Sequence, residues 1–272
     1  MHVDEHTIEL DEGPVFYHSS PYEGDPVLYL HGSPTSSDDW IPFLELTGGI
    51  APDLPGFGRS SKSGHLDYSM AGHADFLERF LAHLGVDRVK LVAHDWGAAA
   101  GLVLAQRNPD RIARLLLCDA TPLLDSFEWH RLARAWRLPV IGEFIMGATS
   151  RRMLARGLRR ACVQGDAWPD ARVKQVWDQF DQGTQRAILR LHRAADPTRL
   201  AAAGLGLEEL DMPTLILWGE RDPWLGPELA HGYAERLAQA EVEVIEDAGH
   251  WPWLDKPELV GRVAAFVDPS RP

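Results

Sequence analysis

Three side chains suited to acid–base chemistry stand in short polar stretches, each of which follows a run of apolar residues. Asp95 lies in "LVAHDWGAAAG" (residues 91–101), Asp222 in "LWGERDPWLGP" and His250 in "EDAGHWPW". A carboxylate is ionised at neutral pH and can attack an electrophilic carbon without a base. A histidine oriented by a second carboxylate can afterwards activate water. The sequence therefore predicts a nucleophile, an acid and a base in the order Asp95, Asp222, His250.

The segment around Asp95 has the pattern of a sharp turn between a buried strand and a helix. The apolar run of residues 89–95 ends at the aspartate, and a helix rich in small residues begins at Gly97. Such a turn lifts one side chain out of the sheet and places it near the helix N-terminus, where the helix dipole favours a carboxylate. Asp95 as a plain helix cap is the alternative. The matching positions of Asp222 and His250 favour the catalytic interpretation.

A second loop, "YLHGSPTSS" (residues 29–37), follows another apolar run. Its backbone N–H groups are expected to be free, so we predict an oxyanion or halide site formed by His31, Ser33 and Trp96, with the amides of the latter two as donors. The Ser33–Pro34 bond is a candidate for the cis form, because cis peptide bonds occur almost only before proline. A plain turn is the alternative interpretation of this loop.

The elements that must position these residues alternate between short strands and longer helices. Two opening strands are expected at "TIEL" and "PVFYHSS", and buried parallel strands at "PVLYLHG", "VKLVAHD", "ARLLLCDA" and "TLILWG", followed by a half-exposed "EVEVIED". Continuous apolar runs of this length are typical of strands that are buried on both faces. The chain therefore predicts an α/β fold with a mostly parallel sheet, whose carboxyl edge collects the polar loops.

The segment from about residue 121 to residue 212 interrupts this alternation. It has the pattern of several amphipathic helices without a strand, and it contains fourteen Lys/Arg and eleven Asp/Glu. A helical insertion at the carboxyl edge of an open sheet is well placed to cover a site. We predict two core parts, 1–120 and 213–272, and a helical cap, 121–212.

Composition sets further expectations. The net charge of −13 argues against nucleic acid or an anionic membrane as the main partner. No apolar run reaches membrane-spanning length, and the acidic N-terminal stretch lacks a signal-peptide core, so we expect a cytoplasmic protein. Cys118 and Cys162 are expected to be reduced, buried thiols. We expect a monomer or homodimer that holds no metal.

The motifs "HGSPTSS", "APDLPGFGRSS", "HDWG", "WGERDP" and "AGHWPW" together resemble the α/β-hydrolase superfamily. The resemblance is to its aspartate-nucleophile branch, which contains haloalkane dehalogenases and epoxide hydrolases, and it covers about residues 1–120 and 212–270. It implies an eight-stranded sheet with a helical cap after the sixth strand. It also implies a reaction that needs no cofactor, with a small apolar organic substrate and water as the partners.

An aspartate in place of the usual serine predicts an electrophile that is a saturated carbon. Serine would form an ether there, whereas an aspartyl ester can be hydrolysed by water that His250 activates. The indole N–H of Trp96 suits a departing halide. Epoxide hydrolases of this family carry cap tyrosines as proton donors, and residues 121–212 contain none. We expect a haloalkane dehalogenase-like enzyme; an epoxide hydrolase with another proton donor, or a ligand-binding protein, are the alternatives.

Two assignments stay open in the sequence. Dehalogenases of this type use a second halide donor, either an asparagine where Ser33 stands or a tryptophan of the cap. The cap residues that are candidates to reach the site are Trp129, His130, Trp136 and Trp177, with His192 beside His130 as a possible proton donor. Asp119, at the end of "LLLCDA", is the alternative to Asp222 as the catalytic acid. We prefer Asp222 because the "GERD" loop matches the commoner arrangement.

Overall fold

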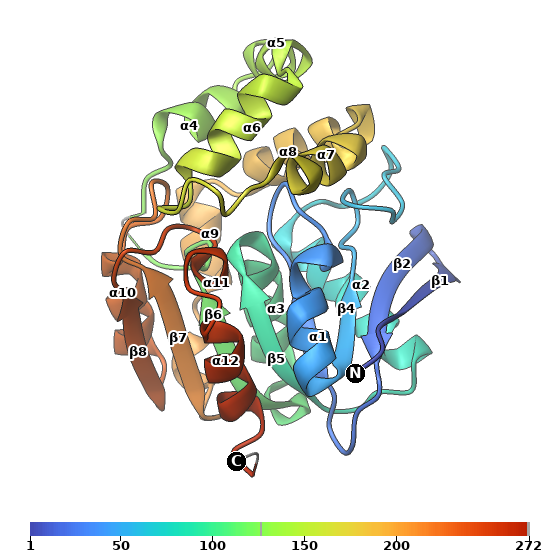
Figure 1. The fold of residues 1–272 in the computed structure, drawn as a ribbon, viewed down its shortest axis with the longest axis vertical. Coiled ribbons are helices and arrows are strands. Elements are labelled where there is room, and N and C mark those ends of the chain that lie inside the picture. Colours follow the sequence, from blue (N-terminus) through green and yellow to red (C-terminus); the bar gives the residue numbers. More distant parts are fainter. Residues whose placement is uncertain (126, 271–272) are drawn as a thin grey trace.

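A computed structural model describes residues 1–125 and 127–270, and an eight-stranded sheet forms its centre (Figure 1). The strands are β1 (Asp4–Leu10), β2 (Gly13–Ser20), β3 (Val27–Leu30), β4 (Gly49–Pro52), β5 (Val89–His94), β6 (Ile112–Cys118), β7 (Thr214–Gly219) and β8 (Ala240–Ile245). Their order in the sheet is β1-β2-β4-β3-β5-β6-β7-β8. Only the pairs β1–β2 and β2–β4 are antiparallel. The predicted α/β fold with a mostly parallel, eight-stranded sheet is confirmed.

Helices cover both faces of this sheet, which explains the continuous apolar runs of the central strands. One face carries α2 (Met70–His83), α3 (Asp95–Arg107) and α10 (Glu228–Arg236), and the other carries α1 (Ile41–Thr47), α11 (Pro252–Asp255) and α12 (Leu259–Val267) (Figure 1). Each face has its own cluster of buried apolar side chains. In contrast, β8 at the sheet edge is only partly buried, as its alternating sequence predicts.

Helix α3 lies unusually close to the sheet because its first turns are built from glycine and alanine. A Cβ atom on Gly97 would lie 2.4 Å from the carbonyl oxygen of His31, so no larger residue fits there without movement. Ala98, Ala99 and Ala100 are fully buried behind it. This close approach brings the N-terminus of α3 against the loop that follows β3.

Between β6 and β7, the described residues form a short 3-10 helix (Leu207–Glu209), no strand, and six α-helices. They are α4 (Arg131–Arg137), α5 (Ile141–Ala148), α6 (Arg151–Arg160), α7 (Asp170–Gln179), α8 (Gln182–Ala194) and α9 (Pro197–Ala203). The first five lie beyond the carboxyl edge of the sheet, whereas α9 lies beside the sheet (Figure 1). There the side chain of Gln106 donates to the carbonyl of Ala203 at 2.8 Å, which ties α9 to α3.

The helical segment is fastened to the core by polar contacts at its start and near its middle. At its start, the Tyr233 hydroxyl donates to the carbonyl of Thr121 at 2.7 Å and accepts from the amide of Leu123 at 2.8 Å. After α6, the carboxylate of Asp255 accepts three backbone N–H groups, those of Val163, Gln164 and Gly249. These contacts set the height of the helices above the sheet edge.

Three smaller expectations from the sequence concern the two cysteines, one bond before proline and membrane-spanning helices. Cys118 and Cys162 are buried and unpaired, as predicted, and burial raises the pKa of the Cys162 thiol to about 12. The Ser33–Pro34 peptide bond is cis, as proposed from its sequence. Among the described helices, none combines the length and the apolar character that crossing a bilayer requires.

Candidate active site

The loops after β5, β7 and β8 bring Asp95, Asp222 and His250 together at the carboxyl edge of the sheet. Nδ1 of His250 lies 2.6 Å from Oδ2 of Asp222, and its Nε2 lies 4.0 Å from Oδ2 of Asp95. All three side chains are buried. The histidine thus stands between two carboxylates, hydrogen-bonded to that of Asp222 and close to that of Asp95. This is the arrangement that the chain order predicts for an acid, a base and a nucleophile.

Asp95 sits at the sharp turn between β5 and α3 with φ of +48°, a conformation that few non-glycine residues adopt. Its Oδ2 accepts the backbone N–H of Ser33 at 2.9 Å, its Oδ1 accepts the hydroxyl of Thr121 at 2.7 Å, and the amide of Trp96 also bonds to the carboxylate. The two amides predicted to form an oxyanion hole therefore hold the aspartate itself. Thr121 was missed by the sequence analysis, because nothing in "DATPLL" indicates that its hydroxyl turns toward Asp95.

Opposing effects act on the charge of Asp95. Burial raises the pKa of its carboxyl, while the charge of His250 and the N–H and O–H donors around the carboxylate counteract part of this rise. The result is a carboxylate that is poorly hydrated and more basic than one in water. Poor hydration favours attack on carbon, because fewer water molecules must leave the nucleophile first.

His250 has a pKa that is raised above its ordinary value. Burial alone would lower the pKa of this imidazole, but the charge of Asp222, its hydrogen bond and the charge of Asp95 together outweigh burial. Because Nδ1 donates to Asp222, the second ring nitrogen faces Asp95. A neutral His250 can therefore accept a proton at Nε2 from a water molecule placed beside Asp95.

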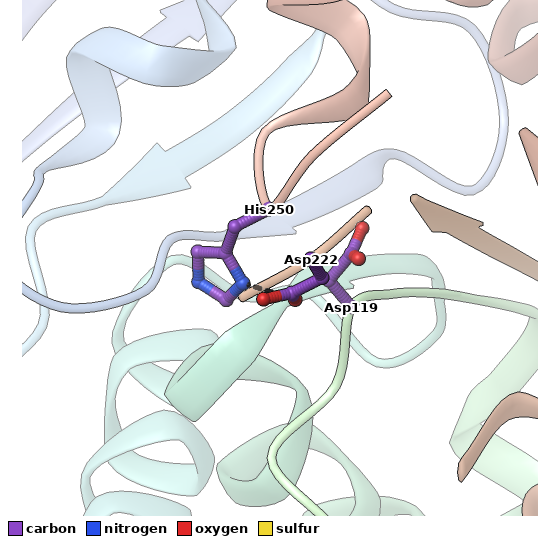
Figure 2. A group of neighbouring side chains, drawn as sticks. All are labelled: Asp119, Asp222 and His250. Atoms are coloured by element: carbon purple, nitrogen blue, oxygen red, sulfur yellow. Dashed lines mark hydrogen bonds and ion pairs between the residues drawn. The ribbon is translucent and has the colours of Figure 1, made fainter. Parts of the chain in front are cut away.

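Asp119, the alternative acid, lies beside Asp222 at the end of β6 (Figure 2). Its Oδ1 accepts the backbone N–H of Gly219 at 3.0 Å, and it makes no hydrogen bond to His250. Burial, with the charge and hydrogen bond of Asp222, raises the pKa of Asp119 far above its ordinary value, which favours its protonated form. The geometry favours Asp222 as the partner of His250.

Asp119, Asp222 and His250 offer ligand atoms within 4.8 Å of one another, a spacing that a metal ion would also require. The donor atoms are already used in another way. Nδ1 of His250 and Oδ2 of Asp222 bond directly to each other, and the raised pKa of Asp119 disfavours the ionised form that a metal ion would bind. This use of the atoms favours a hydrogen-bonded acid–base group over a metal centre.

A second histidine, His94, supports His250 and was also missed by the sequence analysis. Its Nε2 lies 2.7 Å from the carbonyl oxygen of His250, and the two ring centroids are 4.6 Å apart. Burial lowers the pKa of His94 well below its ordinary value, so its neutral ring donates one N–H to that carbonyl. His94 therefore acts as a positioning residue for the loop that carries His250. The signal for His94 in the sequence is its position directly before Asp95 in "AHDW".

A cavity of about 240 Å³ lies between this group and the cap. Asp95, His250, Trp96 and Ser33 form its floor, and apolar side chains of α4, α5, α6 and α8 form its walls. None of the described residues that line it is a tyrosine. The cavity suits a small, largely apolar molecule with its reactive carbon next to Asp95.

Several aromatic rings gather above Trp96. Trp129 stacks on Trp96 with centroids 5.3 Å apart, and the ring of His192 contacts the rings of Trp96, Trp129 and Trp136. Nε1 of Trp129 already donates to the carbonyl of Ala195 at 2.8 Å. In contrast, Nε1 of Trp136 is buried without a partner, and Nε1 of Trp96 makes no hydrogen bond within the described part of the chain. The Trp136 N–H is enclosed by protein and does not open on the cavity, whereas the indole N–H of Trp96 is free to bind a ligand there.

The two histidines considered as proton donors both line the cavity. Burial lowers the pKa of His192 to about 3, and its Nδ1 donates to the carbonyl of Ile188, so the ring is neutral. His130 accepts the amide of Ala133 at Nδ1, which places its proton on Nε2, and burial lowers its pKa as well. Neither histidine carries a charge at neutral pH.

Two predicted site residues lie outside the cavity, and these expectations are corrected. His31 is fully buried beneath the loop: its Nδ1 contacts the carbonyl of Gly32 at 2.8 Å and its Nε2 accepts the amide of Leu54 at 2.9 Å. With both nitrogens used, it shapes the loop instead of meeting a ligand. Trp177 stacks on Phe180 near the end of α7 and does not line the cavity. Trp129, His130 and Trp136 do line it, as predicted.

Comparison with known proteins agrees with this fold and site. The family described as the alpha/beta hydrolase fold matches residues 25–144 and 152–257, and the chain belongs to this family. Within it, the relatives include haloalkane dehalogenases and epoxide hydrolases, and the chain is a hydrolase of this type.

Three of the matches show how much of the chain is similar. A haloalkane dehalogenase of Mesorhizobium japonicum is 29% identical over 95% of this chain and 89% of its own length. A cis-3-alkyl-4-alkyloxetan-2-one decarboxylase of Xanthomonas campestris is also 29% identical, over 95% of this chain and 91% of its own. The crystal structure of a haloalkane dehalogenase of Bradyrhizobium elkani has a TM-score of 0.83 at 26% identity, covering 98% of both chains.

Proposed function

We propose that the protein hydrolyses the carbon–halogen bond of small apolar haloalkanes through an aspartyl-ester intermediate. The observation that carries this proposal is the pairing of a poorly hydrated Asp95 carboxylate with the unpaired indole N–H of Trp96 in one apolar cavity. A halide is a weak hydrogen-bond acceptor, so it needs such donors in a site from which water is excluded.

In the first step, a carboxylate oxygen of Asp95 attacks the saturated carbon and the halide leaves with the bonding electron pair. The indole N–H of Trp96 stabilises the developing negative charge. No proton moves in this step, because the nucleophile is already ionised and a halide leaves without protonation. The cavity therefore requires no acid at the leaving group, in keeping with its lack of a tyrosine.

In the second step, His250 activates a water molecule that attacks the carbonyl carbon of the ester. Ester formation removes the charge of Asp95, which is one of the charges that raise the pKa of His250. The neutral form of the base is therefore favoured when it is needed. The amides of Ser33 and Trp96 stabilise the oxyanion, Asp222 stabilises the imidazolium, and collapse releases the alcohol and restores the carboxylate.

The test is the intact mass of the His250→Ala variant after incubation with a bromoalkane. Attack proceeds without the base while hydrolysis stalls, so we expect a mass gain equal to the alkyl group minus one hydrogen. The matched control, Asp95→Asn in the same background, should show no gain. An unmodified His250→Ala protein with a panel of haloalkanes would refute the dehalogenase proposal.

An epoxide hydrolase is the second candidate, and His130 is the observation that favours it. His130 lines the cavity, and because its Nδ1 accepts a backbone amide, its ring proton is on Nε2. This Nε2–H group can donate to an opening ring oxygen. The same mass experiment separates this function, because a trapped epoxide adds its whole mass. His130→Ala should then abolish the adduct with the epoxide and leave the adduct with the bromoalkane intact.

The similarity to the oxetan-2-one decarboxylase suggests one further substrate for the same experiment. Attack of Asp95 on the saturated ring carbon that bears the ring oxygen would expel a carboxylate, which also leaves without a proton. Loss of carbon dioxide with expulsion of Asp95 would then give an alkene. Release of an alkene from a cis-dialkyl β-lactone, with no halide released from any haloalkane, would favour this reaction over the dehalogenase.

A further inference from the structure

The charges of this protein are strongly segregated. Residues 131–160, which we call the cap tip, contain eight arginines and one glutamate, and no lysine, aspartate or histidine. The cap tip therefore carries +7, and the remainder of the chain, with nineteen Lys/Arg and thirty-nine Asp/Glu, carries −20. The total of −13, from which we predicted no membrane partner, averages over these two regions.

The cap tip also concentrates the exposed apolar side chains of the molecule. Among the described residues, six of the eleven exposed large hydrophobic residues belong to it: Leu132, Leu138, Val140, Ile141, Phe144 and Met153. Val140 and Phe144 are 78% and 76% exposed, respectively. Both lie at α5, which forms the end of the molecule that is farthest from the sheet (Figure 1). Apolar residues gathered at a protruding end mark an interaction site.

Val140 is held in an unfavourable conformation that presents its side chain to solvent. Its φ is +69° and its ψ is −48°, and the amide of Ile141 donates to the carbonyl of Pro139 at 2.8 Å across it, which defines a strained γ-turn. A β-branched residue is particularly costly at positive φ, where asparagine or glycine would fit. Strain of this kind points to a functional constraint at the position.

The arginines of α6 form a groove next to this apolar end. Five of them, Arg151, Arg152, Arg156, Arg159 and Arg160, line it together with the single acidic residue Asp170. Arg159 pairs with Asp170 at 2.6 Å, whereas Arg152, Arg156 and Arg160 have no acidic partner in residues 1–125 and 127–270. Unpaired guanidinium groups in a groove are suited to phosphate oxygens.

We infer that the cap tip docks on the surface of an anionic phospholipid bilayer, with its arginines on the lipid phosphates and the side chains of Val140 and Phe144 among the outer acyl carbons. Basic residues that flank exposed apolar ones are the pattern of proteins that lie on an anionic membrane. The inference does not depend on the reaction proposed above.

The position of the active-site cavity agrees with this docking. Leu132 and Met153 both line the cavity, yet they are 45% and 51% exposed, so the cavity opens at the cap tip. An apolar substrate concentrates in lipid rather than in water. Docking in this orientation places the cavity entrance where such a substrate is dissolved.

A second copy of the chain fits this surface less well. A twofold contact through the cap tip would set each basic region against the same basic region of the other copy. A lipid surface supplies the opposite charge. The acidic remainder of the molecule lies on the sheet side, and at physiological salt charges separated by more than about 8 Å are largely screened.

The test is binding to phosphatidylcholine vesicles with and without phosphatidylglycerol, measured by flotation. We expect binding only to the anionic vesicles, weakened by salt. Each arginine near an anionic surface contributes about fivefold to partitioning, so Arg152→Gln with Arg156→Gln should weaken binding about 25-fold. Val140→Asn with Phe144→Ser should weaken it without loss of thermal stability, since asparagine relieves the strained turn.

A matched control removes the same kinds of side chain away from the cap tip. Arg88, Arg199 and Leu205 are exposed residues outside it. Arg88→Gln with Arg199→Gln, and Leu205→Ser, should bind anionic vesicles as the unaltered protein does. Absence of binding to anionic vesicles, or equal losses in control and cap-tip variants, would overturn the inference. A dimer in solution that the cap-tip variants dissociate would also overturn it, because a second copy would then cover this surface.

Discussion

Replacing Asp222 by asparagine tests whether this residue is the acid of the triad. Oδ1 of Asp222 accepts the amides of Trp224 and Leu225 at 2.8 and 3.1 Å, while Oδ2 faces Nδ1 of His250 at 2.6 Å. An asparagine keeps its carbonyl oxygen on the two amides and turns its NH₂ group toward Nδ1. That nitrogen must then accept a hydrogen bond, so the imidazole proton moves to Nε2, the atom that should accept a proton from water.

The expected loss is large because the wrong tautomer cannot act as a base. The corresponding aspartate-to-asparagine change in serine proteases lowers kcat by about 10⁴-fold, or about 5.5 kcal/mol of activation free energy. We expect a loss of this order in steady-state halide release by Asp222→Asn. The attack by Asp95 needs no base, so single-turnover mass spectra should show the alkyl ester accumulating.

Asp119→Asn is the matched control, since it makes the same change in the neighbouring carboxyl. The raised pKa of Asp119 favours its neutral form, and its Oδ1 accepts the N–H of Gly219; an asparagine is also neutral and can keep this contact. We expect less than about a tenfold change in kcat, in line with the modest net value of a single neutral hydrogen bond. Equal losses in the two variants, or an Asp222→Asn protein as active as the unaltered one, would refute the assignment of the acid.

Three further predictions concern protonation, space and stability. The pKa of His250 is raised in the free enzyme, so its imidazole should titrate above 6.5 in an NMR titration of the unaltered protein. Ester hydrolysis requires neutral His250 in an intermediate that lacks the charge of Asp95, so kcat should rise with pH through a lower midpoint and then level off; equal midpoints in the two measurements would contradict the coupling to Asp95. Gly32→Ala places a Cβ atom 2.5 Å from Cβ of Asp95 and should lower kcat/KM on the order of a hundredfold, whereas Gly147→Ala, which meets only open space, should leave it unchanged. Tyr233→Phe leaves two buried backbone groups at the start of the cap without partners. It should lower the free energy of unfolding, measured in urea, by about 1–3 kcal/mol. An unchanged urea midpoint would count against a role of the Tyr233 hydroxyl in holding the cap.

The sequence by itself determined the sheet and the order of the reactive residues along it. Continuous apolar runs specify buried parallel strands, and the glycine and alanine residues after Asp95 specify a helix that packs closely on them. Since parallel strands end at one edge, polar residues that follow β5, β7 and β8 must lie near one another. These are local patterns with a fixed geometric consequence, which is why Asp95, Asp222 and His250 could be predicted together.

Only the tertiary structure decided which of several similar side chains meet in space. Asp119 and Asp222 both follow a strand, and the single hydrogen bond to His250 distinguishes them. His31 and His94 likewise both lie at the end of a strand, but the first supports a loop and the second supports His250.

The cap was the least predictable part of the site. Its tryptophans have similar helical surroundings in the sequence, and only the packing of α4, α5, α7 and α8 shows that Trp136 lines the cavity while Trp177 lies outside it. The segregation of charge can be counted from the sequence, but its meaning appears only when α5 and α6 are placed at the exposed end of the molecule. Side-chain direction on an amphipathic helix depends on what the helix packs against, and that is a property of the whole fold.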